Sequence, residues 1–455
     1  MQRRSFMKLM ATNAVALGAA STLSACKLKG GGNSNSIQPN LRFINLALGQ
    51  PQLNVSVSTG GSTFTTVAFQ QNSGYKSVNW SGTQTVTLSD ANNNTLSTFS
   101  LAPNQSAHYT TYVYNTSGGV QHYTEQTDSF TVSSGKFVVR TFATTTIGSA
   151  SGATPSTFDV YITGANDDIS PTGYAPTISG TSGAPTAYTA EQAVGSFRIR
   201  VTQASTKNVV FDSGSANLIA FGSQNAYTIL LYSVGSAWLP TLMLVQPTSD
   251  TVTILNNSLS RIRVLQGSPD VKLARFSVDS TKILVNAAFG TATTYQQEPS
   301  GTHSLVFGDD TAGLGTPFCT VPAASSSLVG GTDYTVISSG LEANATGLIF
   351  SDLYQPSPVA DLKVRFINAT QDQATVDVIL NNSPLTGVTG LKAGNASANQ
   401  DLNGAIDNKV AFVIGGTVTQ LGAQLDMGTL SAGGQYTVAL IGANGTYQTV
   451  MLQPS

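Results

Sequence analysis

Residues 362–368 are "LKVRFIN", a short run in which Arg365 stands between apolar residues. Related runs begin at three earlier positions: "LRFIN" at 41, "FVVRTF" at 137 and "SRIRVL" at 260. The matching arginines are Arg42, Arg140 and Arg263. A run that recurs in this way indicates a repeat architecture, in which each repeat is one structural unit.

A second run, built on Tyr-Thr, follows each arginine run. These runs are "YTTYVY" at 109, "YTILLYS" at 227, "YTVISSG" at 334 and "YTVALIG" at 436, and they begin 67, 87, 71 and 71 residues after the arginines. Three segments then close on Gln-Pro, at Pro247, Pro356 and Pro454. We expect the arginines at solvent-facing strand positions, where their long side chains cover apolar surface. We expect the tyrosines in cores or corners.

The pattern inside each repeat predicts strands. "TQTVTLS" at 83, "SFRIRVT" at 196 and "THSLVFG" at 302 alternate polar and apolar residues, which is the period of a half-buried strand. "SDANNNT" at 89 is a turn cluster between two such runs, as expected for a hairpin. Short strands in units of about 100 residues predict an all-β chain of four tandem immunoglobulin-like β-sandwich domains.

The repeat also predicts the domain limits. A signal peptide (1–25) and a lipidated cysteine with a flexible tether (26–39) come first. Four β-sandwiches follow, at 40–135, 136–257, 258–360 and 361–455, and the second of them carries a loop insertion. We expect each unit to close its own core, and therefore to fold as a separate fragment.

Three longer stretches carry a resemblance to a known family. "VRFINATQDQATVDVILNN" (364–382) and "IRVLQGSPDVKLARFSVD" (262–279) resemble the opening of the domain-of-unknown-function family 4397. "GSFRIRVTQASTKNVVFDS" (195–213) resembles its middle hairpin. The second repeat departs from the opening motif, with "TTTIGSASGATPSTFDVYI" in place of the short turn. The resemblance implies a bacterial envelope protein with sandwich folds, and it implies no reaction.

The first 26 residues have the order of a secretory signal. Arg3, Arg4 and Lys8 precede the mildly apolar stretch "LMATNAVALGAASTLSA", which is too short to span a bilayer. "LSAC", ending at Cys26, resembles the bacterial lipobox, in which a thiol takes a diacylglyceryl group and becomes the new N-terminus. We therefore expect a lipoprotein anchored through Cys26, since several acyl chains hold a protein firmly at a membrane.

The same segment carries a second export signal. "RRSFMK" resembles the twin-arginine motif, although Gln2 and Met7 depart from it, and a general secretory signal stays the alternative. The tether "KLKGGGNSNSIQPN" begins with Lys27 rather than with aspartate. In lipoproteins that this chain resembles, an aspartate there signals retention at the inner membrane. We therefore expect a cell-envelope location, at the outer membrane if the host has one.

Composition narrows the class of partner. The chain of 455 residues has 21 basic and 23 acidic residues, so net charge does not attract it to nucleic acid. Only 10% of residues are charged, against about 25% in typical soluble proteins. After processing only Cys319 remains, so no intramolecular disulfide is expected and folding depends on apolar burial.

A search for catalytic and metal-binding motifs finds none that fits. His108, His122 and His303 are scattered, and the zincin, nucleophile-elbow and Walker patterns are missing. "DANNNT" from Asp90 lacks the glycine and glutamate of an EF-hand, so a turn is expected. "GDDTAG" at 308 and "NDD" at 166 are read as solvated turns, with a calcium loop as the alternative. Cys319 is expected to be a small buried hydrophobe, with a reactive thiol as the alternative. We expect no cofactor and no metal.

One segment stands out from the repeat. Residues 163–190, "TGANDDISPTGYAPTISGTSGAPTAYTA", contain an insertion of about 15 residues relative to the first and third repeats. We expect a long unstructured loop, and loops on a rigid sandwich often carry function. Tyr174 and Tyr188 are the candidate ligand-binding residues, since aromatic side chains supply contact area for few rotatable bonds. A tolerated surface insertion is the alternative.

Two classes of function follow. The first is a lipid-anchored, non-enzymatic envelope protein that presents its sandwiches to a glycan, peptidoglycan or protein partner. The alternative is an enzyme, or an accessory subunit of an envelope enzyme, with a site assembled across domains. The scarcity of histidine and of clustered carboxylates favours the first class, because general acid–base catalysis needs such groups.

Overall fold

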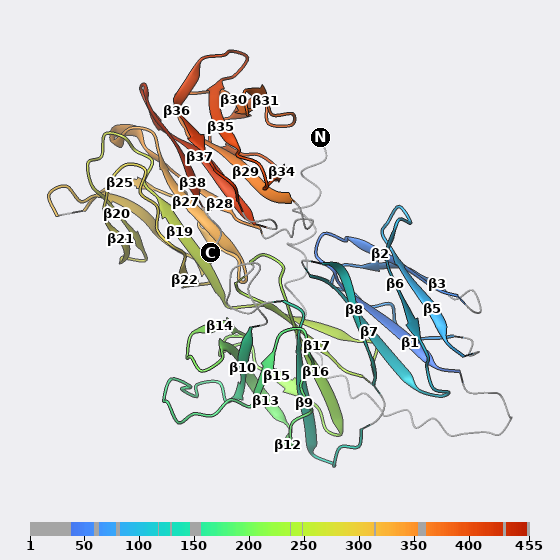
Figure 1. Ribbon diagram of the computed structural model, residues 1–455. Helices are drawn as coiled ribbons and strands as arrows, with labels where there is room; N and C mark the ends of the chain where they lie inside the picture. The colour runs from blue at the N-terminus through green and yellow to red at the C-terminus, as the bar shows by residue number, and fades with distance from the viewer. Residues whose placement is uncertain are drawn as a thin grey trace. The chain divides into compact units, whose positions relative to one another are not determined.

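The computed structural model describes residues 38–58, 63–78, 82–116, 118–127, 130–145, 156–236, 238–247, 249–313, 315–353, 361–430 and 434–452. In these residues the regular structure is strand, apart from one 3₁₀ helix, η1 (Glu342–Asn344). No helix in the same residues is long and apolar enough to cross a membrane. The predicted all-β fold class of tandem sandwiches is confirmed (Figure 1).

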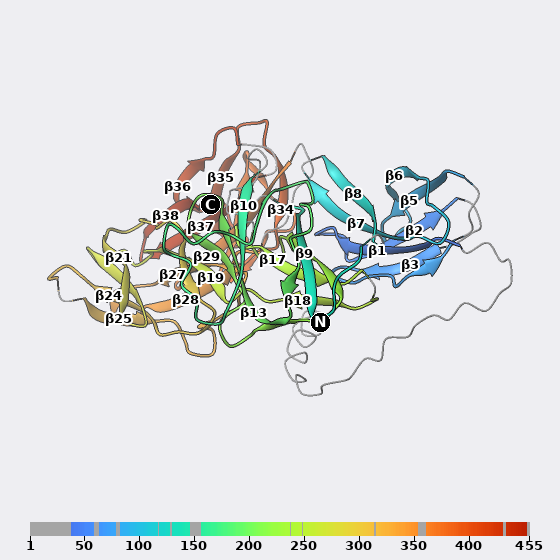
Figure 2. The same cartoon turned by 90° about the horizontal axis from the view of Figure 1, so that it is seen from below.

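Sandwich 1 consists of two four-stranded sheets with the orders β4-β1-β7-β8 and β3-β2-β5-β6. Its strands are β1 (Asn40–Leu46), β2 (Gln52–Val57), β3 (Thr63–Ala68), β4 (Lys76–Ser77), β5 (Gln84–Ser89), β6 (Thr95–Leu101), β7 (His108–Thr116) and β8 (Gly119–Gln126). Figure 2 shows β2, β5 and β6 of the second sheet beside one another. Side chains from both sheets form one apolar cluster, which includes Phe43, Val55 and Val86.

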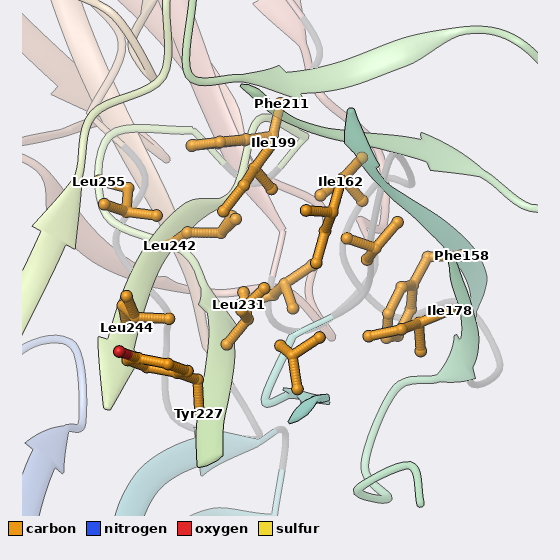
Figure 3. Close-up of a cluster of buried hydrophobic side chains, with 14 of the residues drawn as sticks. Phe158, Ile162, Ile178, Ile199, Phe211, Tyr227, Leu231, Leu242, Leu244 and Leu255 are labelled. Carbon is orange, nitrogen blue, oxygen red and sulfur yellow. The ribbon is translucent and has the colours of Figure 1, made fainter. Parts of the chain in front are cut away.

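Sandwich 2 has sheets with the orders β12-β9-β16-β17-β18 and β11-β10-β13-β14, and β15 also pairs with β13. Its strands are β9 (Lys136–Ala143), β10 (Thr157–Thr163), β11 (Ile178–Thr181), β12 (Gln192–Ala193), β13 (Gly195–Gln203), β14 (Val209–Asp212), β15 (Ile219–Phe221), β16 (Asn225–Tyr232), β17 (Thr241–Val245) and β18 (Val252–Leu255). Figure 3 shows its core, where Phe158 and Ile199 of one sheet lie in the same cluster as Leu231 and Leu242 of the other.

Sandwich 3 has sheets with the orders β22-β19-β27-β28 and β21-β20-β24-β25, together with the small sheet β23-β26. Its strands are β19 (Leu259–Leu265), β20 (Ala274–Val278), β21 (Thr281–Ala287), β22 (Gln296–Pro299), β23 (Gly301–Thr302), β24 (Leu305–Asp309), β25 (Thr316–Thr320), β26 (Ser327–Leu328), β27 (Asp333–Ser339) and β28 (Thr346–Ser351). Cys319 is buried in its core with Phe276 and Phe307, and burial raises the pKa of this thiol to about 12. The prediction of a small buried hydrophobe is confirmed.

Sandwich 4 has sheets built around β29-β37-β38 and β30-β35-β36, with short strands paired to β29 and β30. Its strands are β29 (Asp361–Thr370), β30 (Thr375–Leu380), β31 (Ser383–Pro384), β32 (Leu391–Lys392), β33 (Asn395–Ala396), β34 (Gln400–Asn403), β35 (Lys409–Ile414), β36 (Gln420–Asp426), β37 (Gln435–Ala443) and β38 (Thr446–Leu452). Val364, Phe366, Val378 and Phe412 lie in its core. The exact domain limits, and the ability of each unit to fold alone, stay predictions.

The repeated arginine and Tyr-Thr runs form parallel strand pairs. The pairs are β1 with β7, β9 with β16, β19 with β27 and β29 with β37. In every pair the arginine lies directly opposite the threonine that follows the tyrosine. Arg42, Arg140 and Arg263 each donate from Nε to that threonine hydroxyl, over 3.2, 3.1 and 2.8 Å. The near-constant spacing between the arginine and Tyr-Thr runs in the sequence therefore reflects this pairing of arginine with threonine across the two strands.

The repeated tyrosines lie at the corners that lead into these strands. Tyr109, Tyr227 and Tyr334 are buried, and each hydroxyl accepts a hydrogen bond from the backbone N–H five residues earlier, over 2.9, 2.8 and 2.8 Å. A buried phenol needs such a partner, and this arrangement is the tyrosine corner of immunoglobulin-like sandwiches. The prediction that these tyrosines are core or corner residues is confirmed.

The recurrent arginines are not at solvent-facing positions, so that prediction is wrong. Arg42 is 0% exposed and Arg263 is 4% exposed, and the side chains of Arg140 and Arg365 are each 12% exposed. The physical reason is that the sheet that carries each arginine is covered on both faces. One side of the sheet faces its own sandwich core, and the other side is covered by a neighbouring sandwich.

Two apolar clusters cover these outer faces. One contains Ile44 and Tyr112 of sandwich 1 together with Phe142 and Leu230 of sandwich 2. The other contains Leu265 and Ile337 of sandwich 3 together with Ile367 and Ile441 of sandwich 4. Strands that are buried on both faces carry near-continuous apolar runs, and the burial of β1 and β37 follows this rule.

Buried charged groups at these faces have an ion-pair or a hydrogen-bond partner, as their desolvation requires. Arg140 forms an ion pair with Glu125, which also accepts a 2.6 Å hydrogen bond from the Tyr112 hydroxyl. Arg42 donates to the carbonyl oxygens of Gln246 and Ser249, over 3.3 and 2.5 Å. Each guanidinium therefore links its own sheet to the neighbouring sandwich.

Asp352 is the centre of an ionic network between two sandwiches. Its carboxylate forms ion pairs with Arg365 and with Arg263, the second over 3.5 Å. It also accepts hydrogen bonds from the hydroxyls of Tyr295, over 2.6 Å, and Thr335. The carboxylate neutralises two buried cations from two sandwiches.

Replacing Asp352 with asparagine should lower the free energy of unfolding by about 3–5 kcal/mol, because two buried guanidinium groups lose their counter-charge. Urea unfolding measures this difference. Asp401→Asn is the matched control, since Asp401 pairs with Lys363 but its side chain is 49% exposed, and exposed ion pairs contribute little.

The effect of Asp352→Asn should also depend on pH. Burial alone would raise the pKa of Asp352, but Arg365 and Arg263 hold that pKa below its ordinary value. A carboxylate with a lowered pKa stabilises fully above its unfolded-state pKa of about 3.9, and this contribution is lost as the pH falls through the folded-state value. The difference between wild type and Asp352→Asn should therefore shrink below about pH 4. Equal effects of the two variants at neutral pH would contradict this assignment.

Candidate functional site

The predicted site residues fall in two parts of the chain. Cys26 lies outside the described residues, so lipidation stays a prediction. Tyr174 and Tyr188 lie in the insertion of sandwich 2, at residues 163–190, and both are half-buried. The site is therefore built from the strands that border this insertion, β9 and β10.

The insertion is not the long unstructured loop that we expected. Residues Ile178–Thr181 form β11, which pairs with β10. The next residues run along β9, where Thr186 and Thr189 donate their backbone N–H groups to the carbonyl oxygens of Thr141 and Val139, both over 2.9 Å. The reason for the difference is that both strands would otherwise present unpaired edges. Residues 164–177 precede β11 and contain no strand, and they are here called the covering loop.

Tyr188 packs on the β9 side of sandwich 2. Its ring lies 4.6 Å from the guanidinium carbon of Arg140 and 5.9 Å from the ring of Phe130. It also packs against the small buried cluster of Val132, Val138 and Ala226. Arg140 is the cation that Glu125 neutralises, so Tyr188 completes a structural contact. Its role as a ligand-binding residue stays a prediction.

Tyr174 lies on the other sheet, beside β10. Its ring centroid is 6.2 Å from that of Tyr161, and its hydroxyl is 3.4 Å from a carboxylate oxygen of Asp167. Its backbone carbonyl accepts a 2.8 Å hydrogen bond from Lys207 Nζ. Burial and then the nearby Asp167 raise the pKa of Tyr174. The structure therefore does not bring the two predicted tyrosines together.

Next to Tyr174 lies an unusual polar surface. Residues of β10 and β13 that point away from the core are polar, yet almost all of them are buried. We call this surface the covered face, and it consists of Asp159, Tyr161, Thr163, Arg198, Arg200 and Thr202. At the corresponding outer position in sandwich 1, Ser56 of β2 is exposed. The covering loop contacts this face at Ala165 and at Tyr174.

Of the two arginines of the covered face, Arg198 forms an ion pair and Arg200 does not. Arg198 holds Asp212 with both its Nε, over 2.8 Å, and its Nη2. Arg200 is only 6% exposed and makes one hydrogen bond, from Nη2 to the Thr163 hydroxyl over 2.7 Å. Its Nε is buried without a hydrogen-bond partner, as is the hydroxyl of Thr202. Buried polar atoms are nearly always paired, so this spot differs from the rest of the sandwich.

Lys207 adds a second cation beside the covered face. Its Nζ lies 4.7 Å from the ring centroid of Tyr161 and donates a 3.0 Å hydrogen bond to the hydroxyl of that ring. Among the described residues, no carboxylate lies within ion-pair distance of Arg200 or Lys207. Burial, and then Arg198, lower the pKa of Arg200, but a guanidinium stays protonated at neutral pH. The arrangement is suited to hold an anion.

The acidic turns noted in the sequence are local structures. Asp90 accepts hydrogen bonds from the backbone N–H groups of Asn92 and Asn94, both over 2.8 Å, and closes the β5–β6 hairpin as predicted. Asp168 and Asp309 each accept one from the residue two positions later, over 2.8 and 2.9 Å. Within the described part of the chain, no three His, Cys, Asp or Glu side chains gather where a metal ion could be held.

One part of the chain matches a known protein family. Residues 260–378 match the family model described as domain of unknown function (DUF4397). The predicted resemblance is confirmed there. The match spans less than half of the chain, from β19 into β30. No curated protein sequence matches the chain.

Two solved structures are similar to parts of the chain. A candidate cell adhesion protein from Bacteroides uniformis ATCC 8492 is 12% identical, covers 49% of this chain and 100% of its own, and gives a TM-score of 0.22. A candidate cell adhesion protein from Bacteroides fragilis NCTC 9343 is 11% identical, covers 71% of this chain and 98% of its own, and gives a TM-score of 0.12. TM-scores this low do not establish a common fold.

Reasoning from the sequence missed Arg198, Arg200 and Lys207. The signal was present in "SFRIRVT", where the two arginines alternate with the apolar residues Ile199 and Val201. The strand pattern showed that they point away from the core. It did not show that the inserted segment folds over them.

The two tyrosines should respond differently to substitution. Tyr188→Ala should lower the free energy of unfolding by about 1–3 kcal/mol, because it removes a ring packed on Arg140 and Phe130. Tyr174→Ala should stay close to wild type, because its hydroxyl makes only one long hydrogen bond. Urea unfolding of the two variants tests this difference. A loss at Tyr174 as large as that at Tyr188 would show that the covering loop is part of the folded core.

Proposed function

We propose that this chain is a lipid-anchored, non-enzymatic binding protein of the cell envelope. The anchor is Cys26, and the recognition site is the covered face of sandwich 2 together with the covering loop. The four sandwiches carry this site, and the tether after Cys26 separates it from the membrane. The partner is a component of the envelope or of its surroundings, and a glycan is the partner class that we favour.

The observation that carries this proposal is that Arg200 is buried without an ion pair and with its Nε unpartnered. Asp212 and Asp167 act on Arg200 electrostatically, but neither forms an ion pair with it. A buried cation without an ion pair is unfavourable in a folded chain, and a buried donor without an acceptor adds to that penalty. A bound anion would remove both penalties at once, since hydrogen bonds to charged groups are among the strongest in proteins. A site that is unfavourable when empty and satisfied when occupied supports a binding role.

The chemical groups on the covered face support binding rather than catalysis. Most are guanidinium, ammonium, phenol and hydroxyl groups, which orient and neutralise an anion. The one carboxylate among them, Asp159, is already held by the Ser179 hydroxyl and the Ser205 N–H. The insertion that covers them lies beside strands of a rigid sandwich, which is where binding loops are commonly placed.

The recognition site can be tested on a glycan array with purified chain carrying Cys26→Ser. Binding to a subset of glycans is expected. Replacing residues 166–173 of the covering loop with a Gly-Ser linker of equal length should abolish that binding, because the loop borders the site. The matched control replaces residues 416–418 of the β35–β36 turn, where Val418 is exposed, and should bind as wild type does. Binding that survives the loop replacement would place recognition elsewhere on the chain.

The anchor has its own test. Cys26→Ser should leave the chain without acyl groups and shift it from the membrane fraction to the soluble fraction, since lipid chains supply the membrane affinity. Fractionation and labelling with a fatty-acid probe measure this change. Unchanged fractionation of the variant, or no label on the wild-type chain, would remove the lipoprotein part of the proposal.

A further inference from the structure

We infer that the covered face binds the carboxylate of an acidic sugar, with Arg200 as its direct partner. This inference rests on the proposed function and names the ligand class for the same site. It follows from the difference between two neighbouring arginines, from the charges around them and from the position of the site on its sheet.

The contacts of Arg198 show which group the Nε–Nη2 side of the Arg200 guanidinium is suited to hold. Both arginines are on β13 and on the same face of its sheet, two residues apart. Arg198 uses Nε and Nη2 to hold the two oxygens of Asp212, the planar fork that matches a carboxylate. Arg200 has its Nε buried and unpartnered, whereas its Nη2 bonds only to a hydroxyl. Among the described residues, a carboxylate pairs with Arg198 but none pairs with Arg200.

Two further groups fit a carboxylate at this position. The Thr202 hydroxyl is buried without a partner on the same face, and it can donate a hydrogen bond to an oxygen that Arg200 also contacts. Lys207 supplies a second positive charge beside Tyr161. In surroundings of lower effective dielectric than water, these charges act more strongly on an anion than exposed lysines would.

The acidic residues of the covering loop limit the charge of the ligand. Asp167 and Asp168 are exposed and lie near enough to Arg200 to interact with it electrostatically. They would repel a ligand that carries several negative charges close together, such as a densely sulfated glycan. The surroundings therefore favour a single carboxylate in an otherwise neutral region.

The position of the site favours a sugar acid over a peptide. Extended peptides gain much of their affinity by pairing with a free sheet edge. The Arg200 site is on the face of its sheet, and β13 has strand neighbours on both sides. A sugar carboxylate needs no strand pairing, and the half-buried ring of Tyr174 borders the site with an amphipathic surface. The bound group must enter beneath the covering loop, which Lys207 holds at the carbonyl of Tyr174.

The test uses calorimetry with galacturonate, which carries a single carboxylate, its methyl ester and neutral galactose, on the full chain carrying Cys26→Ser. Wild type should bind the free acid and bind neither neutral compound. Arg200→Gln should weaken binding of the acid by about 10- to 100-fold, because a charge-assisted hydrogen bond is lost. Arg200→Lys should bind more weakly than wild type, since it keeps the charge and loses the planar fork.

Arg275→Gln is the matched control. Arg275 is a half-buried arginine of β20 in sandwich 3, where it donates to the Gly315 carbonyl over 2.8 Å, and its loss should leave galacturonate binding unchanged. Thermal unfolding checks that the Arg200 variants fold, and the acid should raise the melting temperature of wild type but not of Arg200→Gln. Equal binding of acid and ester, no binding of the acid, or undiminished binding by Arg200→Gln would overturn the inference. Loop-dependent binding of neutral glycans on the array would do so too, while leaving the proposed function intact.

Discussion

In all four sandwiches an arginine of the opening strand bonds to a threonine of a parallel strand far along the chain. The two residues are separated by 68, 88, 72 and 72 positions. The contact fixes the register of the parallel pair, and the tyrosine beside the threonine then closes the corner. Because the guanidinium is buried, its remaining donors need acceptors. For Arg42, Arg140 and Arg365 those acceptors come from a neighbouring sandwich, and they are Ser249, Glu125 and Ser351.

The repeated anchors made much of the fold predictable. Arginine and tyrosine recur in one order, and alternation in runs such as "TQTVTLS" gives a strand with Val86 and Leu88 inside. The exposure of the arginines was not predictable in the same way. Alternation shows which residues leave the core of one sandwich, but not whether a second sandwich covers them. Ile44 and Phe142 meet across such a boundary, and no local pattern pairs two positions so far apart.

The candidate site depends on the same kind of long-range covering. The sequence identified the insertion and Tyr174, but it did not single out Arg198 and Arg200. It also suggested a free loop, because Gly, Pro, Ser and Thr favour turns. The structure instead uses the threonines of this segment along β9, where Thr186 and Thr189 accept backbone hydrogen bonds through their hydroxyls. Composition alone does not distinguish a solvated loop from a segment that completes a sheet edge.

The parallel pairing of the opening strand has a consequence for the order of folding. β1 cannot find its partner until about 70 further residues have left the ribosome, which takes several seconds at about 5–20 residues per second. During that interval Phe43 and Ile44 have neither of the faces that later bury them. Contacts of this long range fold slowly, and the delay recurs with every repeat. A nascent chain of this kind therefore exposes one unpaired, apolar strand after another during its synthesis, and exposed strands of this type are prone to aggregate.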